Sequence, residues 1–303
     1  MHKRIMFILA ALAISLFTTA AVTAQEKAAP EGIQHVIWIG SDGFGSHYTD
    51  WSELPNLTKM RDAGSWTLHM RSVLPSASAL NWETMLVGAP SEMHGFRTWG
   101  SKEPDVEPIY RNEHGRYPDI FRVVKDQMPD AKTACAYDWD GIGYLYDKSC
   151  VDDDVLCDSG EKVLEAALKQ LEAKPTFAFF YFGEVDVAGH GYGWGSPEYH
   201  AAVVKTDEYV GKIFEKLNEL GMTEENTVVY FTSDHGGSDK GHGDARLDHM
   251  EVPFIIWGRG IETGEITDVV VNFDCAPNAA WLFGLERPQA WRGMPVYSAT
   301  EKK

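Results

Sequence analysis

The chain has 303 residues, a formal net charge of −18 and four cysteines, and 44% of its residues are hydrophobic. This length and apolar content suit one large domain with a substantial core. The excess of acidic residues argues against nonspecific binding to nucleic acid or to anionic membranes, which depends on clustered lysine and arginine. An anionic substrate would therefore need a local source of positive charge at its binding site.

The first 24 residues have the pattern of a secretory signal peptide. A basic start (MHKR) precedes an apolar run (IMFILAALAISLF) and a segment of small residues that ends at Ala24. We expect cleavage after Ala24, export to a secreted or periplasmic location, and a mature chain without a membrane span. Residues 25–303 would then form a single α/β metallohydrolase domain.

The cysteines are expected to form disulfides, because an oxidising compartment permits them and no zinc-ribbon spacing is present. Cys150 and Cys157 bracket a short loop, and Cys135 and Cys275 form the other candidate pair. Four cysteines allow about three connectivities, and the sequence does not choose among them.

Four short apolar runs predict buried strands at residues 35–40, 176–183, 227–233 and 252–258. Because these runs are apolar on both faces, we expect a sheet covered on both sides, as in parallel or mixed sheets. Helical patterns at residues 159–173, 196–221 and 273–285 alternate with the strands. The sequence therefore predicts an α/β fold, a three-layer sandwich with a largely parallel central sheet.

Acidic and imidazole side chains follow three of the predicted strands, where ligands gather in open α/β sheets. With one more histidine downstream, the candidate metal ligands are Asp42, Asp186, His190, Asp234, His235 and His242. Three carboxylates and three imidazoles are too many for one tetrahedral zinc ion and suit two divalent ions. Mixed nitrogen and oxygen ligands favour zinc, with manganese or iron as alternatives. Two such ions would supply the positive charge that a phosphate ester needs.

Several segments resemble, in this order, the alkaline phosphatase superfamily, and most closely its nucleotide pyrophosphatase/phosphodiesterase branch. They are VIWIGSDGFG, LPSASALNWETMLVGAPSEMHG, GEVDVAGHGYG, TSDHGG, KGHGD and NFDCAPNAAWLFGL. The resemblance implies an alkaline-phosphatase-like fold with two zinc sites, one held by Asp186, His190 and His242 and the other by Asp42, Asp234 and His235. It places the nucleophile, a further ligand of the second zinc, at Ser78, where related phosphodiesterases usually have threonine. It also implies that Asn81 donates to a non-bridging phosphoryl oxygen.

Ser78 suits the nucleophile role on physical grounds as well, since a serine hydroxyl beside a metal can lose its proton. Residues 79–89 look helical, so Ser78 is expected as an N-cap with helix N–H groups near the phosphoryl oxygens. Ser76 competes with Ser78 on composition, but the spacing to Asn81 favours Ser78. His249 competes with His242 as a ligand, but the GHG segment around His242 matches the family pattern and permits a close backbone approach.

The expected activity is hydrolysis of phosphate diesters by a secreted dizinc phosphodiesterase or nucleotide pyrophosphatase, through a phosphoserine at Ser78. A phosphate monoesterase or a phosphonate hydrolase on the same metal site is the alternative, and a non-catalytic glycan- or metal-binding exoprotein is a third. A monoesterase needs extra cations, for which Arg71, Arg97 and Lys102 are candidates. Trp82 stands where related phosphodiesterases often have histidine. The expected partner is a small-molecule phosphate ester rather than nucleic acid. The aromatic residues that are candidates to stack on it are Trp82, Trp99, Trp139, Tyr192 and Trp194.

Overall fold

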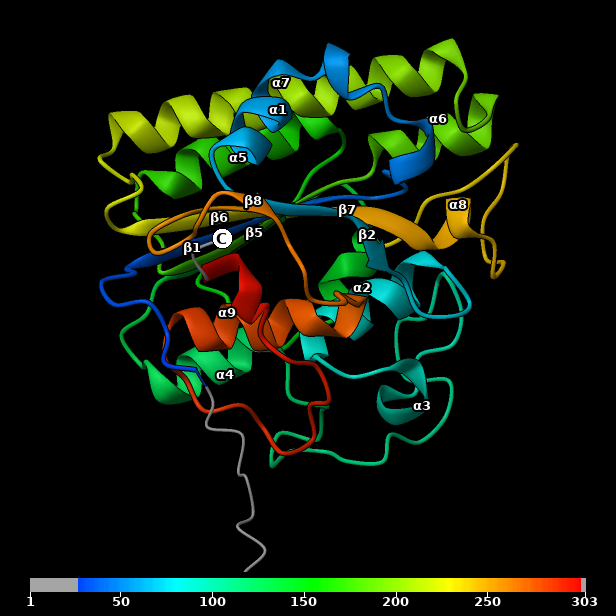
Figure 1. The fold of residues 1–303 in the computed structure, drawn as a ribbon. Helices are drawn as coiled ribbons and strands as arrows, with labels where there is room; N and C mark the ends of the chain where they lie inside the picture. Colours follow the sequence, from blue (N-terminus) through cyan, green and yellow to red (C-terminus); the bar gives the residue numbers. More distant parts are fainter. Residues whose placement is uncertain (1–26, 301–303) are drawn as a thin grey trace, which may run out of the picture.

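A computed structural model describes residues 27–300, so the predicted signal peptide lies outside the described residues. A central eight-stranded sheet has the order β4-β3-β5-β1-β6-β7-β2-β8 (Figure 1). The strands are β1 (His35–Ser41), β2 (Ser65–Arg71), β3 (Thr133–Tyr137), β4 (Asp153–Leu156), β5 (Phe177–Phe182), β6 (Thr227–Thr232), β7 (Glu251–Gly258) and β8 (Gly264–Glu265). From β4 to β6 all neighbours are parallel, whereas β7 runs antiparallel to both β6 and β2.

Helices cover both faces of this sheet, which confirms the predicted three-layer α/β sandwich (Figure 1). On one side lie α1 (Pro55–Asp62), α5 (Gly160–Leu171) and α7 (Pro197–Glu219), and on the other α2 (Ser78–Val87), α4 (Ile120–Gln127) and α9 (Cys275–Leu282). The shorter helices are α3 (Ser91–His94), α6 (Glu184–Tyr192) and α8 (Leu247–Met250). Along β1, Trp38 packs into the core on the α2 side and Ile39 into the core on the α7 side. Successive side chains of a strand point to opposite faces, so two buried faces require the continuous apolar run seen in the sequence.

The four strands predicted from apolar runs are present as β1, β5, β6 and β7, and the other four were missed. Of the missed strands, β2 alternates buried with partly exposed residues, and the edge strand β4 is acidic and partly exposed. The strand β3 is fully buried, but its run of five residues is short and rich in alanine. The predicted helices are present as α5, α7 and α9.

The disulfide prediction is wrong for this structure, in which all four cysteines are free thiols. Cys150 and Cys157 flank β4, and that extended strand of four residues separates them by about 13 Å at roughly 3.3 Å per residue. A disulfide needs Cα atoms within about 7 Å. Cys135 and Cys275 are buried as thiols in the core on the α2 side of the sheet.

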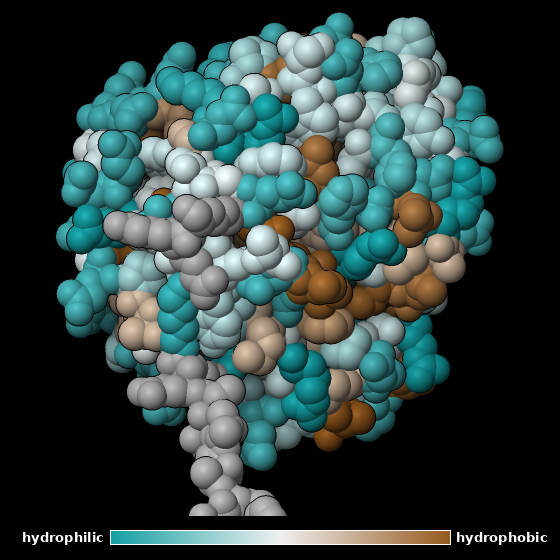
Figure 2. All heavy atoms as spheres, viewed as in Figure 1, coloured by the Kyte–Doolittle hydropathy of each residue, from teal (hydrophilic) through white to brown (hydrophobic). Residues whose placement is uncertain are grey.

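The surface is mainly hydrophilic on the face drawn in Figure 2, where apolar residues appear in small groups. Within residues 27–300 no helix combines the length and apolar character that crossing a bilayer requires.

Candidate active site

The parallel strands β1 and β6 bring two acidic residues to the same level at one edge of the sheet. Gly40 of β1 is paired with Thr232 of β6, so Asp42 and Asp234 each lie two residues beyond a matched pair. Adjacent strands are about 4.8 Å apart, which places these carboxylates side by side. Both side chains are essentially inaccessible to solvent.

The neighbouring strand β5 leads into α6, which carries Asp186 and His190 four residues apart on one helical face. Gly43 makes the close approach of this helix possible. A Cβ atom at Gly43 would lie 2.8 Å from the Cα atom of Asp186, and the φ angle of +69° is one that side-chain-bearing residues rarely adopt.

Three histidines direct the same ring nitrogen toward these acids. The Nδ1 atoms of His190, His235 and His242 lie 3.0, 2.9 and 2.6 Å from the backbone carbonyls of Lys240, Gly236 and Ser76. A carbonyl only accepts a hydrogen bond, so each Nδ1 carries a proton and Nε2 is the ring atom left to bind a metal ion. A backbone carbonyl on Nδ1 is the arrangement that orients metal-binding histidines.

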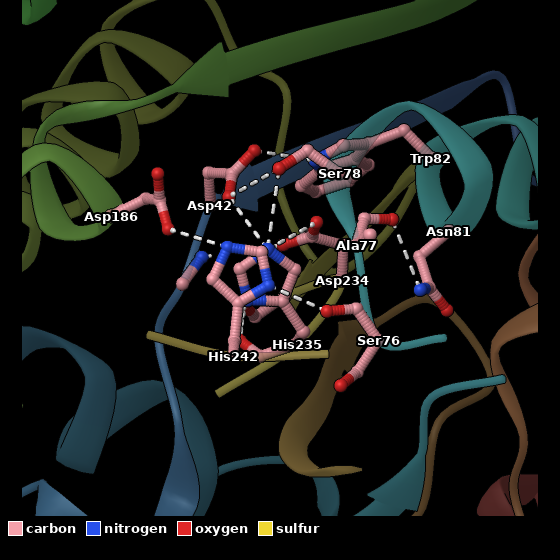
Figure 3. A network of polar contacts seen from close by, with 12 residues as sticks. Asp42, Ser76, Ala77, Ser78, Asn81, Trp82, Asp186, Asp234, His235 and His242 are labelled. Carbon is pink, nitrogen blue, oxygen red and sulfur yellow. Dashed lines mark hydrogen bonds and ion pairs between the residues drawn. The ribbon is translucent and has the colours of Figure 1, made fainter. Parts of the chain in front are cut away.

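The donor atoms gather around His235, which lies in one cluster with Asp42 and Asp234 and in a second with Asp186 and His242 (Figure 3). His190 adjoins the second cluster, so the donors are described below as a first group (Asp186, His190 and His242) and a second group (Asp42, Asp234 and His235). In the first group, His190 Nε2 lies 3.0 Å from His242 Nε2 and 3.5 Å from Asp186 Oδ1. The distance between Asp186 Oδ1 and His242 Nε2 is 3.8 Å. In the second, His235 Nε2 lies 3.4 Å from Asp42 Oδ1 and 3.3 Å from Asp234 Oδ2. Ligands about 2.0–2.1 Å from a tetrahedral zinc ion are about 3.3 Å apart. The His235 ring stacks on the His242 ring at 3.7 Å, so the two groups adjoin.

The electrostatics of this cluster call for bound cations. Burial raises the pKa values of Asp42, Asp186 and Asp234, and it lowers the pKa of His235 and that of His242, the latter to about 4. Asp186 Oδ1 and Asp234 Oδ2 are buried without any hydrogen-bond partner in the described part of the chain. Buried carboxylates facing lone pairs of neutral imidazoles are costly unless a cation lies between them. The donor set therefore fits two divalent ions.

Ser78 lies beside the second group of donors. Its hydroxyl is 3.2 Å from His235 Nε2 and 3.5 Å from Asp42 Oδ1. Ser78 is the first residue of α2 rather than its N-cap, which is Ala77, and the Ala79 N–H already donates to the carbonyl of Trp99. The Ala79 N–H is therefore not available to a phosphoryl oxygen.

The competing residues have other partners. Ser76 Oγ accepts a hydrogen bond from the Gly243 N–H and donates to the carbonyl of Asp244, away from the donor groups. His249 Nε2 lies 2.7 Å from Ser238 Oγ, and its Nδ1 accepts from the Asp244 N–H, so this ring fastens the loop that carries His242.

Asn81 does not have the position expected of a phosphoryl donor. Its amide is fully buried and donates to the carbonyls of Val73, Pro75 and Ala77, and it points away from Ser78 (Figure 3). Its Oδ1 atom accepts from Asn272, which also donates to the carbonyl of Asp234. In this structure Asn81 holds the loop before Ser78, because the backbone of that loop needs internal hydrogen-bond partners.

Two aromatic residues orient Asp42, namely Trp82, which the sequence marked only as a residue that could stack on a substrate, and Tyr181, which it did not mark. Tyr181 Oη and Trp82 Nε1 donate to Asp42 Oδ2 at 2.6 and 2.9 Å, which leaves Oδ1 to face Ser78 and His235. Trp82 is thus buried and hydrogen-bonded to Asp42, so it is not free to stack on a substrate. A tyrosine at the carboxyl end of the aromatic strand β5 was the available signal for Tyr181.

Of the other aromatic candidates, Trp99 and Tyr192 are 67% and 61% exposed, whereas Trp194 is buried and donates to the carbonyl of Gly43. Exposed rings near the site remain available to a ligand.

Sequence comparison places this site in a known family. Residues 36–252 match the family described as type I phosphodiesterase / nucleotide pyrophosphatase. The chain belongs to this family. Its residues 36–252 contain both donor groups and Ser78.

Curated relatives include GPI ethanolamine phosphate transferase 1 of Yarrowia lipolytica, 28% identical over 193 residues that make up 61% of this chain and 19% of the relative. The bis(5'-adenosyl)-triphosphatase ENPP4 of Pongo abelii is 25% identical over 218 residues, 66% of this chain and 47% of that protein. The chain thus spans about a fifth to about half of the length of these relatives.

Solved structures share the fold. An inactive variant of murine ectonucleotide pyrophosphatase/phosphodiesterase 5 in complex with AMP aligns with a TM-score of 0.70 at 15% identity, over 88% of this chain and 99% of that one. BT1596, a 2-O GAG sulfatase, aligns with a TM-score of 0.69 at 13% identity, over 89% of this chain and 75% of that one. These likenesses confirm the alkaline-phosphatase-like fold.

Proposed function

We propose that this chain is an exported phosphodiesterase or nucleotide pyrophosphatase that binds two zinc ions and acts through a phosphoserine at Ser78. The observation that carries the proposal is the Ser78 hydroxyl beside two adjoining donor groups in which three histidine Nε2 atoms face the carboxylates of Asp42, Asp186 and Asp234. Bound divalent ions would lower the pKa of the serine hydroxyl and offset the charge of the phosphate. Export rests on the first 24 residues alone, since the free thiols lend it no support.

In this reaction Ser78 Oγ attacks phosphorus and its proton passes to solvent. The bond from phosphorus to the leaving-group oxygen breaks, and that oxygen keeps the electron pair and takes up a proton from solvent. Water then attacks the phosphoserine and releases Ser78 with a proton restored. The start of α2 fixes the direction of the nucleophile, and Asp42 is held from behind by Tyr181 and Trp82. Such preorganisation is the main contribution of a protein to phosphoryl transfer.

Of the three candidate cations, Arg97 is exposed and the other two are already paired, which favours a diester over a monoester. Lys102 forms an ion pair with Asp140 at 2.7 Å, and Arg71 forms one with Glu251 at 3.0 Å. Neither is free to take up the second negative charge of a monoester. Transfer is the alternative to hydrolysis: if an alcohol replaced water in the second step, the phosphoryl group would pass from Ser78 to that alcohol. The relative from Yarrowia lipolytica is named as a phosphate transferase.

The test is a comparison of bis(p-nitrophenyl) phosphate, p-nitrophenyl phosphate and an aryl phosphonate as substrates of zinc-loaded protein. We expect kcat/KM to be highest for the diester. Ser78→Ala should reduce turnover by at least about 10³-fold, the scale of losing a nucleophile. The matched variant Ser76→Ala removes a hydroxyl two residues away and should retain most activity. Turnover by Ser78→Ala close to that of the unmodified chain would refute the covalent route, and a preference for the monoester would reverse the substrate assignment.

A further inference from the structure

A second cavity, of about 250 Å³, lies beside α2 and away from the metal-ligand candidates. Its walls include Glu83, His94, Phe96, Arg116, Tyr117 and Tyr144, and none of the metal-ligand candidates lines it. Glu83 is five residues beyond Ser78 on α2, a displacement of about 7.5 Å along the helix axis. The cavity is therefore close to the candidate active site yet separate from it.

The inner wall of this cavity carries a carboxyl group with no partner. Glu83 is only 3% exposed, and its Oε2 atom is inaccessible and accepts no hydrogen bond. Nothing in the part of the chain that the structure describes forms a hydrogen bond or ion pair with this carboxyl group. Burial raises the pKa of Glu83 well above its usual value. Buried polar groups in folded proteins are nearly always paired, so this one calls for an explanation.

The cations around the cavity differ in how they are paired. Lys102 and Arg111 form ion pairs with Asp140 and Glu107. Arg116 instead donates to the backbone carbonyl of Tyr144 at 2.6 Å and has no carboxylate partner among the described residues. Its charge acts on Glu83 without an ion pair between them.

The remaining wall combines an uncharged histidine, one exposed glutamate and aromatic rings. Burial lowers the pKa of His94 to about 3, and its two ring nitrogens are engaged by Thr84 and by the Phe96 N–H. Glu103 lines the cavity from an exposed position, where water screens it. The aromatic rings offer apolar contact to a short carbon chain.

We propose that this cavity binds a small zwitterion, with an ammonium group against Glu83 and an anionic group against Arg116. A purely cationic ligand would leave Arg116 unpaired, and a purely anionic ligand would face the Glu83 carboxyl group. At about 30 Å³ per water molecule, the cavity holds roughly eight water volumes, which suits a ligand of up to about eight heavy atoms.

The test uses the full zinc-loaded chain and calorimetric titration with β-alanine, γ-aminobutyrate and 5-aminopentanoate. This series varies the separation of the charges while keeping both. Butyrate and butylamine, which each lack one charge, are the ligand controls. We expect one amino acid to saturate the protein and to bind at least tenfold more tightly than either control.

Glu83→Gln and Arg116→Gln should each weaken that binding at least tenfold, whereas Lys212→Gln, an exposed change on α7, should not alter it. Thermal unfolding verifies that the variants are folded, and Arg116→Gln alters only a half-buried side chain if Glu83→Gln fails to fold. The proposal is overturned if no amino acid saturates, if butylamine or butyrate binds as tightly as the best zwitterion, or if both variants bind like the unmodified chain. Hydrolysis at Ser78 does not depend on any of these outcomes.

Discussion

Removal of the Tyr181 hydroxyl is the sharpest test of how Asp42 is prepared for a metal ion. Tyr181→Phe deletes one oxygen atom, and with it the 2.6 Å hydrogen bond to Asp42 Oδ2, while the aromatic ring stays in β5. Trp82 would remain as the one donor to that oxygen among the described residues. The carboxylate could then rotate and lose its fixed orientation toward Ser78 and His235.

The magnitude follows from the charge on Asp42. A hydrogen bond to a charged group contributes about 1.5–3 kcal/mol, and about 1.4 kcal/mol corresponds to a tenfold change in an equilibrium constant. We therefore expect zinc affinity to fall about 10- to 100-fold, the range usual when a residue that hydrogen-bonds a metal ligand is removed. Competition with a chromophoric chelator measures this affinity directly and without reference to turnover.

A matched control is available in the same sheet. The hydroxyl of Tyr230, in β6, is buried and has no hydrogen-bond partner in the described chain. Tyr230→Phe removes the same atom without breaking a bond, so zinc affinity should not change. If Tyr181→Phe binds zinc within about threefold of the unmodified chain, as the control should, the hydroxyl does not position Asp42.

Three further predictions concern the backbone, the buried carboxyl group and the thiols. Gly43→Ala forces a left-handed residue, at about 1–2 kcal/mol, and a contact of 2.8 Å with Asp186, so both the melting temperature and zinc affinity should fall; an unchanged melting temperature would contradict the geometry. Burial raises the folded-state pKa of Glu83 above 4.5, while the charges of Arg116 and Asp119 act on this pKa with opposite signs. The contribution of Glu83 to stability is therefore complete below pH 4.5 and is lost as the pH rises toward the folded-state pKa. We therefore compare the unfolding free energies of Glu83→Gln and the unmodified chain by urea titration. Between pH 4.5 and the folded-state pKa, the difference should shift in favour of the variant by about 1.4 kcal/mol per pH unit, and a constant difference would refute the burial argument. A thiol reagent should react with four cysteines in denatured, unreduced protein but quickly only with the half-buried Cys157 in folded protein, and a count of two in the denatured state would reveal a disulfide.

The sequence alone determined the layers of the fold and the chemistry of the site. Strands buried on both faces need unbroken apolar runs, so β1, β5, β6 and β7 were readable, and with them the edge of the sheet where Asp42 and Asp234 emerge. The strand β2 alternates buried with partly exposed residues and β4 is acidic, so neither carries such a run and both were missed. The strand β3 is fully buried, but its five residues were too short a signal.

Only the tertiary structure decided which side chains face one another. The place of Ser78 beside His235, the position of Asn81 behind the nucleophile, and the role of Tyr181 all depend on contacts between segments far apart in the chain. Such contacts are fixed by strand register and by the direction in which each loop leaves the sheet, and residue type and spacing do not encode either one locally. The partnerless carboxyl group of Glu83 is of the same kind, since a glutamate within a helix reads as exposed until the packing around it is known.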